Sequence, residues 1–353
     1  METGIYKDLT LYVGIDVHKK QWSTSIYTDQ LHHKTFSQLP HPETLHSYIN
    51  KHFPGAKVHC AYEATRFGWH IARKLQSYGY SCLVVNPSDI PTTHGESQNK
   101  SDKVDSRKIA RALQAGLLRS SYIPREDTEG DRQLFRYRKR LWSDLVRVKN
   151  RIKGTLMFCG TTIPEPWDKN TWPKAFLRWL RGVDLPSKGA RKTLNMLLDQ
   201  YDLLYTHFLS VSREVRGLLR LARYEKNGKL LQTIPGIGPL TSVQLLCELE
   251  DVSRFPSFKQ LNSFIGFKPT SYSSGEHDWK GHLTIRRHKA LRSALVECAW
   301  TAVQVDPALQ VRYKELIKRM NGKRAIIVIA RKLLSRIYHV LKNQQAYELG
   351  IVK

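Results

Sequence analysis

Apolar and polar positions alternate in two different ways along the first part of the chain, up to about residue 115. Leu11–Val17 is a short apolar run, and in 21–28 apolar residues alternate with polar ones, as expected for strands. In 43–53 the apolar residues recur at helical spacing. The expected order is strand 11–17, strand 21–28, strand 34–39, helix 43–53, strand 58–62, helix 66–78, strand 81–85 and helix 99–113. This order predicts a mixed sheet flanked by helices, an α/β fold.

Beyond Pro124 the pattern changes to helices. An apolar stripe runs through 132–153, whereas 160–192 is rich in Pro, Trp and Gly and predicts a connector with one short helix, 174–180. Between 197 and 222 the apolar residues recur in steps of four and three, the seam of a coiled coil. These segments predict a long antiparallel helical arm, closed within one chain or shared between chains.

A third region begins after Asn227-Gly228. Its turn, Pro235-Gly236-Ile237-Gly238, leads into an expected helix at 240–249 and resembles the helix-hairpin-helix turn, whose backbone N–H groups hold a nucleic-acid phosphate. Two further helices, 307–320 and 323–341, are expected near the end of the chain. The predicted class is therefore α/β plus α, with three parts: 1–125, 126–226 and 227–353.

Charge indicates the class of partner more clearly than the fold pattern does. Lysine and arginine number 57 against 31 aspartates and glutamates, giving a formal net charge of +26 that is spread along the chain. Such an excess suits a polyphosphate, DNA or RNA, because cationic side chains release the counterions of phosphates. We find no signal peptide, apolar span or basic amphipathic anchor, so we expect a soluble, cytoplasmic, nucleoid-associated protein with no membrane partner. Five scattered cysteines without a C-x-x-C pair argue against zinc ribbons and disulfides.

Four carboxylates fall on three of the expected elements of the α/β part. Asp16 interrupts the first strand, Glu63 ends the fourth, and Asp102 and Asp105 stand three apart at the head of a helix, where both lie on one face. A carboxylate within an apolar strand is unfavourable unless it is paired or binds a metal. Oxygen ligands suit Mg²⁺ or Mn²⁺, so these four acids predict a metal-dependent phosphodiester site. The alternatives are acids exposed past strand ends and a helix start with acids at its positive dipole end.

The motifs that carry these acids resemble those of a transposase family. Gly14-Ile15-Asp16, Tyr62-Glu63-Ala64-Thr65 and 99–106 are similar to the four-acid (DEDD) site of the one-ten/eleven-eleven group of insertion-sequence transposases, to which Piv-type DNA invertases are also similar. The resemblance implies a RuvC-like, ribonuclease-H fold for the N-terminal domain. Two positions depart from the family: Arg66 stands where a glycine is usual, and Ser106 replaces a usual alanine.

A serine loop carries the second half of the resemblance. Taken alone, Tyr272-Ser273-Ser274-Gly275 predicts a polar turn, since no His–Asp pair that could activate a nucleophile is evident. Together with 235–238 and 266–269, it matches in order and approximate spacing the C-terminal domain of the same transposases, whose serine attacks DNA. The family pattern places the reacting serine before the glycine, which is Ser274, with Ser273 close enough to compete. Downstream, 283–292 departs from the family's Ile-Thr-Lys-x-Gly-Asn-x-x-Leu-Arg.

Several basic residues and glycines are candidates for contacts to nucleic acid. The segment 132–153 holds nine arginines or lysines and one acid, which makes a nucleic-acid-facing helix about as plausible as a solvated one. The predicted contact residues are Arg136, Arg140, Arg147, Gly236, Gly238, Arg286, Arg287 and Arg292.

The sequence as a whole predicts a DNA recombinase that excises and inserts a mobile element. Asp16, Glu63, Asp102 and Asp105 would hold Mg²⁺ or Mn²⁺, and Ser274 would be the nucleophile. The resemblance further implies a structured guide, or bridge, RNA that pairs with donor and target DNA. It also implies a homo-oligomer, dimer to tetramer, in which one chain's serine completes another chain's acidic site. Two alternatives remain open: a metal-only nuclease acting on branched DNA, and a non-catalytic nucleic-acid-binding protein.

Overall fold

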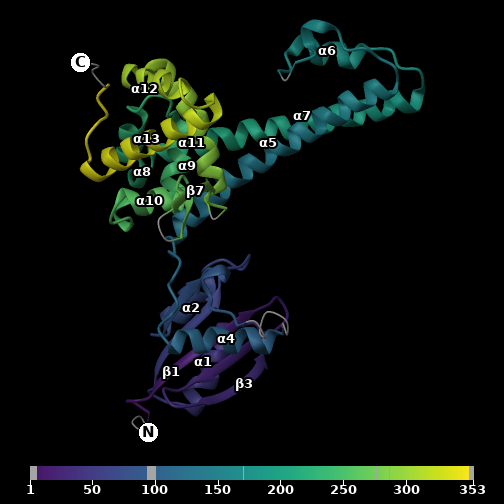
Figure 1. Ribbon diagram of the computed structural model, residues 1–353. Helices are drawn as coiled ribbons and strands as arrows, with labels where there is room; N and C mark the ends of the chain where they lie inside the picture. The colour runs from purple at the N-terminus through teal and green to yellow at the C-terminus, as the bar shows by residue number, and fades with distance from the viewer. Residues whose placement is uncertain (1–5, 94–100, 170, 275–276, 286, 350–353) are drawn as a thin grey trace. The chain divides into compact units, whose positions relative to one another are not determined.

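The chain divides into two compact units, Met1–Pro124 and Arg125–Lys353. The computed structural model describes residues 6–93, 101–169, 171–274, 277–285 and 287–349. Unit 1 is a mixed α/β domain, whereas unit 2 is mostly helical (Figure 1). The predicted change from α/β to helical structure after Pro124 is therefore confirmed. None of the described helices is long and apolar enough to cross a membrane.

Unit 1 is built around one five-stranded sheet of order β3-β2-β1-β4-β5. Its elements are β1 (Thr10–Val17), β2 (Trp22–Tyr27), β3 (His32–Gln38), α1 (Pro42–His52), β4 (Lys57–Glu63), α2 (His70–Ser77), β5 (Ser81–Val85), the 3-10 helix η1 (Pro87–Asp89) and α4 (Asp102–Gln114). β1 pairs antiparallel with β2 and parallel with β4. The helix expected from residue 66 begins later, at His70, because Gly68 takes a positive φ of 70° that interrupts it.

Successive side chains of β1 lie on alternate faces of this sheet. Leu11, Val13 and Ile15 are fully buried and belong to a core shared with α1 and α2. The intervening residue Tyr12 packs against the second core, which contains apolar residues of α4. Because side chains alternate across a strand, Asp16 belongs to the face that α4 covers.

Unit 2 begins with a helical arm formed by α5 (Glu126–Phe158), η2 (Glu165–Trp167), α6 (Lys174–Gly182) and α7 (Lys188–Gly217). α5 and α7 lie side by side, with α6 at the far end of the arm (Figure 1). Residues later in α5 contact residues earlier in α7. The Arg138 guanidinium donates to Ser212 Oγ at 2.8 Å, and Trp142 meets Phe208 with 5.4 Å between ring centroids. The two helices are therefore antiparallel, and the seam packs within one chain.

The expected seam does not extend as far as its apolar pattern. α7 ends at Gly217, and a 3-10 turn, η3 (Leu218–Arg220), separates it from α8 (Ala222–Gln232). Leu221 between them has an extended backbone, φ −70° and ψ 137°. Leu218 and Ala222 thus continue the spacing of the seam without belonging to its helix. Leu218 packs against the large core of unit 2, whereas Ala222 is exposed at the start of α8.

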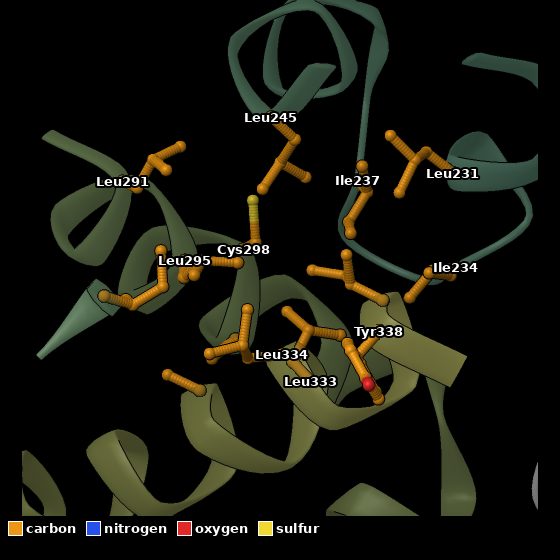
Figure 2. Packing of buried hydrophobic residues seen from close by; sticks show 14 of the residues in the cluster. Leu231, Ile234, Ile237, Leu245, Leu291, Leu295, Cys298, Leu333, Leu334 and Tyr338 are labelled. Carbon is orange, nitrogen blue, oxygen red and sulfur yellow. The ribbon is translucent and has the colours of Figure 1, made fainter. Parts of the chain in front are cut away.

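The remainder of unit 2 packs around one large apolar core. Its elements are α9 (Pro239–Leu249), η4 (Val252–Arg254), α10 (Phe258–Ile265), β6 (Pro269–Ser274), β7 (His277–Leu283), α11 (Lys289–Val305), α12 (Pro307–Ile317) and α13 (Gly322–Asn343). Figure 2 shows Leu245 of α9 above Leu295 of α11 and Leu334 of α13, all within that core. The expected helix 307–320 ends early, at Ile317. The sequence analysis did not predict α10, α11 or the β6–β7 hairpin, which together frame the serine segment.

Candidate functional site

The acids of unit 1 meet where the end of β1 lies against the first turn of α4. A Cβ atom on Gly14 would lie 2.2 Å from the carbonyl oxygen of Ser106, so only glycine permits this approach of strand and helix. Ser101 begins α4 as its N-cap, with its side chain accepting from Val104 N. The glycine of the Gly-Ile-Asp motif thereby lets the helix that carries Asp102 lie close to β1.

Asp16, His18 and Asp102 form the tightest group of potential metal ligands within the described ranges. One ligand atom from each lies within 4.8 Å of the others. His18 Nε2 is 3.1 Å from Asp16 Oδ2 and 3.7 Å from Asp102 Oδ1. The sequence analysis missed His18, although its position two residues after Asp16 gave a signal, because alternate residues share a face.

The carboxylates at this point of the fold are only partly compensated by cationic groups of the protein. Burial raises the pKa of Asp16, and the carboxylates of Asp102 and Asp105 raise it further, while His18 opposes them. Asp105 pairs with Lys108, whose Nζ lies 2.8 Å from Asp105 Oδ1. Unfavourable interaction between like charges in a partly buried place is relieved by a cation that binds between them.

Glu63 lies on the same face of the sheet as Asp16. The parallel register pairs Gly14 with Ala61 and Ile15 with Tyr62. The next residue on each strand is Asp16 on β1 and Glu63 on β4, so these two acids are neighbours across the sheet. Ala61 belongs to the core that α4 covers, and alternation places Glu63 on that side too. Glu63 and Asp105 thus lie next to the group of three without belonging to it.

The donor set fits a divalent cation that prefers oxygen ligands. Asp16 and Asp102 supply carboxylate oxygens, and His18 adds an imidazole nitrogen, which Mn²⁺ accepts more readily than Mg²⁺ does. Asp105 and Glu63 are the next oxygen donors in reach of the same face. Of the four predicted acids, Asp16 and Asp102 therefore come together in one group of potential ligands, with His18 in addition.

The serine segment lies in unit 2 and forms a β-hairpin where a polar turn was expected. Ser274 is the last residue of β6, and its Cα is in register with that of His277 in β7. Ser273 is in register with Asp278. Gly275, on which the choice of Ser274 depended, lies outside the described residues. The backbone thus places both serines at the end of the hairpin away from its base at Pro269.

The three arginines selected on α5 have different surroundings. Arg136 forms a bidentate ion pair with Glu248, Nε to Oε1 at 3.0 Å and Nη2 to Oε2 at 2.9 Å. Arg147 pairs with Asp144 one turn earlier on the same helix. Arg140 is exposed, with its guanidinium 5.9 Å from the ring centroid of Tyr137. Arg140 and Arg147 thus keep their charge at the surface, while Arg136 compensates a buried acid.

The glycines and arginines of 227–353 that were predicted to contact nucleic acid also differ in their surroundings. Gly236 has φ 83°, and a Cβ there would lie 2.3 Å from the carbonyl oxygen of Cys298, so close packing on α11 explains this glycine without a ligand. Gly238 is the N-cap of α9, and a Cβ there would meet no atom within 4 Å. Arg287 and Arg292 line a cavity described below, and Arg286 lies outside the described residues.

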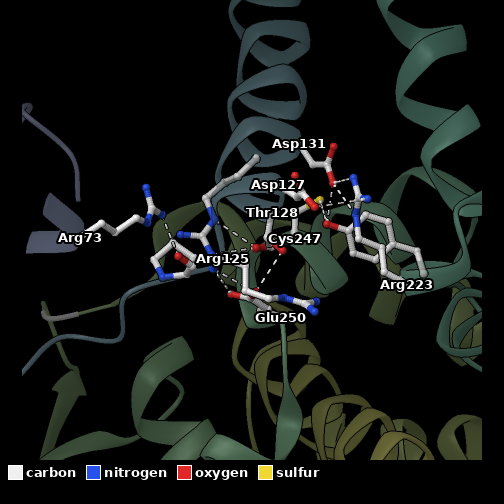
Figure 3. A network of polar contacts seen from close by, with 11 residues as sticks. Arg73, Arg125, Asp127, Thr128, Asp131, Arg223, Cys247 and Glu250 are labelled. Carbon is white, nitrogen blue, oxygen red and sulfur yellow. Dashed lines mark hydrogen bonds and ion pairs between the residues drawn. The ribbon is translucent and has the colours of Figure 1, made fainter. Parts of the chain in front are cut away.

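A polar network that the sequence analysis missed fixes the start of α5 (Figure 3). Glu250 has the positive φ of 58° that is rare outside glycine, and its side chain is 3% exposed. Its Oε1 accepts hydrogen bonds from Arg125 N at 3.1 Å and Thr128 Oγ1 at 3.0 Å. Glu250 therefore caps α5 from a distant part of the chain, which offsets the strain of its backbone.

Comparisons with known proteins match both halves of the chain. Residues 13–160 match a DEDD family model described as "Transposase", and residues 228–314 match one described as "Transposase IS116/IS110/IS902 family". The chain is 24% identical to the transposase for insertion sequence element IS1533 of Leptospira borgpetersenii, covering 97% of this chain and 99% of that protein. It is 25% identical to the pilin gene-inverting protein of Moraxella lacunata, over 96% and 98% respectively. It is also 28% identical to the putative transposase y4qE of Sinorhizobium fredii, over 69% of this chain and 58% of the length of that relative.

Proposed function

Because the chain belongs to the IS116/IS110/IS902 family of transposases, we propose that it cuts and rejoins DNA to move an insertion sequence. The observation that carries this proposal is the convergence of Asp16 and Asp102, from separate elements, with His18 between them. A partly compensated acidic group of this kind suits a divalent cation in phosphoryl transfer. The order of the five strands, with β1 central and parallel to β4, supports a RuvC-like domain as part of the proposal.

The proposed reaction uses the hydroxyl of Ser274 as nucleophile. Its Oγ attacks a DNA phosphorus, the bond from that phosphorus to one deoxyribose oxygen breaks, and the proton of the hydroxyl is passed on to the released oxygen. The number of phosphate ester bonds stays constant, so rejoining needs no external energy source. When bound, the cation would neutralise phosphate charge. Asp16, Glu63, Asp102 and Asp105 would hold it, with His18 as an additional donor.

Covalent trapping tests this proposal directly. A nicked suicide DNA substrate should give a protein–DNA adduct that survives denaturant and maps by peptide mass to Ser274. The adduct should be lost in Ser274→Ala and retained in the matched neighbour Ser273→Ala. The reverse result would move the nucleophile to Ser273. Cleavage without an adduct in any variant would favour the metal-only nuclease, and binding without cleavage would favour a non-catalytic protein.

The oligomer implied by the family resemblance has its own test. If one chain's serine acts with another chain's acids, a mixture of Ser274→Ala and Asp105→Asn should recover activity that neither variant has alone. Light scattering of the same samples measures the number of chains. Mixtures that remain inactive, although each variant binds DNA, would contradict this part of the proposal.

A guide RNA is a further part of the proposal, supported by the surplus of basic residues on α5. Arg140 and Arg147 keep exposed cationic groups, so replacing both by glutamine should weaken RNA binding and reduce its dependence on salt. Arg312→Gln is the control, because Arg312 is another arginine with an acid on the same helix, Glu315. Purification from cells that carry the whole element, without any specific RNA bound, would contradict a guided mechanism.

A further inference from the structure

A cavity of about 520 Å³ lies between α11 and α13 at the base of the β6–β7 hairpin. Apolar side chains, including Val296 and the buried Ile326, contribute to its lining. Four cationic residues border it: Arg287, Lys289, Arg292 and Lys323. The cavity thus joins an apolar surface to a basic rim, a combination that suits a ligand with both an apolar and an anionic part.

One face of α11 supplies much of this cavity. Lys289, Arg292, Val296 and Trp300 follow one another in steps of three, four and four, which places them along one side of a helix. Trp300 is 40% exposed, and its ring meets Tyr313 edge-on, with centroids 5.8 Å apart and planes at 71°. The contact with Tyr313 orients the indole ring while much of it remains accessible.

The cations of the rim repel one another. Burial lowers the pKa of Arg292, and the neighbouring charge of Arg287 lowers it further. Arg292 donates from Nη1 to the Gly266 carbonyl oxygen at 3.1 Å, and in the described part of the chain no acid forms an ion pair with Arg287 or Lys323. Glu297 is the single acid among the lining residues described. The site therefore holds surplus positive charge beside an apolar surface, which favours an anionic ligand.

We propose that this cavity binds one unpaired nucleotide of a nucleic-acid strand, with its base stacked on Trp300 and its phosphate held by Arg287 and Arg292. Stacking on an aromatic ring beside cationic phosphate contacts is how proteins hold single strands. Ser293 and Glu297 line the same cavity and can bond to polar groups on the base edge. An acidic peptide without aromatic residues would satisfy the rim but would offer no ring to stack on Trp300.

The position of this nucleotide site in the fold connects it to the proposed chemistry, so this inference rests on the proposed function. Phe267 precedes β6 and Leu283 ends β7, and both line the cavity. Ser274 ends the six-residue strand β6, roughly 17 Å along the hairpin at about 3.3 Å per residue. Because this length is several times the spacing of neighbouring nucleotides, about 3.4 Å along one strand of a duplex, the site would hold a nucleotide several positions away from the one on which Ser274 acts.

Binding of short single-stranded oligonucleotides to the full chain tests the proposal. By fluorescence anisotropy, Trp300→Ala should weaken binding roughly 5- to 150-fold, the range for loss of one base-stacking contact. Trp300→Phe should retain most of the affinity. Tyr205→Ala is the control, since Tyr205 is another exposed aromatic residue, on α7, and should change affinity little. Arg287→Ala should reduce the slope of log affinity against log salt by about one unit.

Abasic oligonucleotides separate stacking from general loss of structure. One abasic nucleotide at the right position should weaken binding by the wild type but not by Trp300→Ala, because both changes remove the same contact. Matched DNA and RNA strands show which polymer uses the site. Equal binding by the wild type and Trp300→Ala would overturn the proposal. Complete displacement of the oligonucleotide by polyglutamate would also overturn it, if polyglutamate itself binds Trp300→Ala more weakly than the wild type.

These results remain distinguishable from failure of the proposed function. Oligonucleotide binding and DNA-adduct formation are measured on the same samples of the wild type and Trp300→Ala, so that each proposal has its own readout. Binding that depends on Trp300 in a protein that never forms the DNA adduct would contradict only the serine mechanism. Adduct formation together with single-strand binding that ignores Trp300 would contradict only the nucleotide site.

Discussion

Each unit contains a carboxylate within a cluster of charged side chains, and the two clusters shift the pKa of that carboxylate in opposite directions. Glu248 on α9 is 5% exposed and lies within 3.2 Å of Arg132 Nε and His288 Nε2, in addition to its bidentate pair with Arg136. Asp16 on β1 instead faces other carboxylates. Burial would raise the pKa of Glu248, but hydrogen bonds from His288 and Arg136 outweigh it and lower the pKa to about 2. For Asp16, burial raises the pKa, His18 opposes it, and the carboxylates of Asp102 and Asp105 raise it further, so that the pKa stays above its ordinary value.

This difference distinguishes an acid that stabilises the fold from an acid that is available to bind a ligand. Glu248 joins α9 to α5 through Arg136 and to the start of α11 through His288, whose Nδ1 accepts from Leu291 N at 3.2 Å. Its charge is compensated by groups of the protein, so it is a structural residue. Asp16 has His18 beside it but also the carboxylates of Asp102 and Asp105, and its pKa is raised, which is expected where an external cation completes the site.

The largest expected effect comes from neutralising the partly compensated cluster. Asp16→Asn should lower recombination by more than about 100-fold, because loss of a metal ligand removes several kcal/mol of transition-state stabilisation. The free energy of unfolding without metal should stay equal or rise, since repulsion is relieved. Thermal unfolding with and without Mn²⁺ checks the metal: the wild type should gain stability and Asp16→Asn should not.

Asp144→Asn is the control for that experiment, because Asp144 is an exposed acid on α5 and should affect neither metal binding nor activity strongly. Normal recombination by Asp16→Asn would show that the site is assigned wrongly. A clear loss of stability in that variant would show that Asp16 is compensated like Glu248, and the comparison would fail.

Neutralising the compensated acid should have the reverse outcome. Glu248→Gln leaves the buried Arg132 without its ionised partner, and breaking a buried ion pair in this way costs about 3–5 kcal/mol. Urea denaturation of the variant and the wild type measures this difference. Glu225→Gln on α8, which removes an exposed pair with Lys229, should change stability by at most about 0.5 kcal/mol. Equal effects at the two positions would contradict a structural role for Glu248.

The same acid predicts how stability depends on pH. A pKa lowered from 4.5 to about 2 means that the folded state favours the ionised carboxylate. Its contribution, about 3 kcal/mol, is complete above pH 4.5 and is lost as the pH falls towards 2. The stability difference between the wild type and Glu248→Gln should therefore shrink over this interval. A difference that is constant between pH 7 and pH 3 would sink the assignment.

Sequence patterns were sufficient for the strands of unit 1, because period-two alternation is a local signal. They also indicated Asp16 and Asp102, which the structure brings together, but not His18 beside them. They were insufficient where distant segments decide the structure. Nothing near Glu248 in the sequence shows that Arg136, selected as a phosphate contact, is its partner. Likewise, Gly236 looked like part of a phosphate-binding turn, whereas the backbone of α11 requires it.

The long helices show the same limit. The seam of α7 was visible in the spacing of its apolar residues, but the end of the helix at Gly217 was not, since apolar residues continue at the same spacing into the core. The hairpin was missed because its strands are short and polar, Pro269–Ser274 and His277–Leu283. Its serines were found through the family resemblance and not through periodicity.

A smaller change tests whether geometry as well as charge forms the acidic cluster. Gly14→Ala places a Cβ against the Ser106 carbonyl oxygen, which should destabilise unit 1 by about 1–3 kcal/mol and move α4 away from β1. Affinity for Mn²⁺, measured by calorimetry, should fall with it, because Asp102 moves away from Asp16. Gly130→Ala, where a Cβ meets no atom within 4 Å, should instead be neutral or stabilising. Unchanged metal affinity in Gly14→Ala would show that metal binding does not depend on the position of α4.

The smallest expected effect concerns Ser106, the residue that departs from the family's usual alanine. Its side chain is fully buried, and its Oγ lies 3.1 Å from Ser23 Oγ and 2.9 Å from Ser25 Oγ of β2. Ser106→Ala removes these bonds and leaves the two strand hydroxyls with fewer partners, so it should destabilise unit 1 by about 1 kcal/mol. Simultaneous replacement of Ser23 and Ser106 by alanine should cost less than the sum of the two single changes, because they share a bond. Mn²⁺ affinity should stay at the wild-type value, since Ser106 belongs to the compensated polar interior and not to the ligand group. A drop in affinity would place the hydroxyl cluster within the metal site.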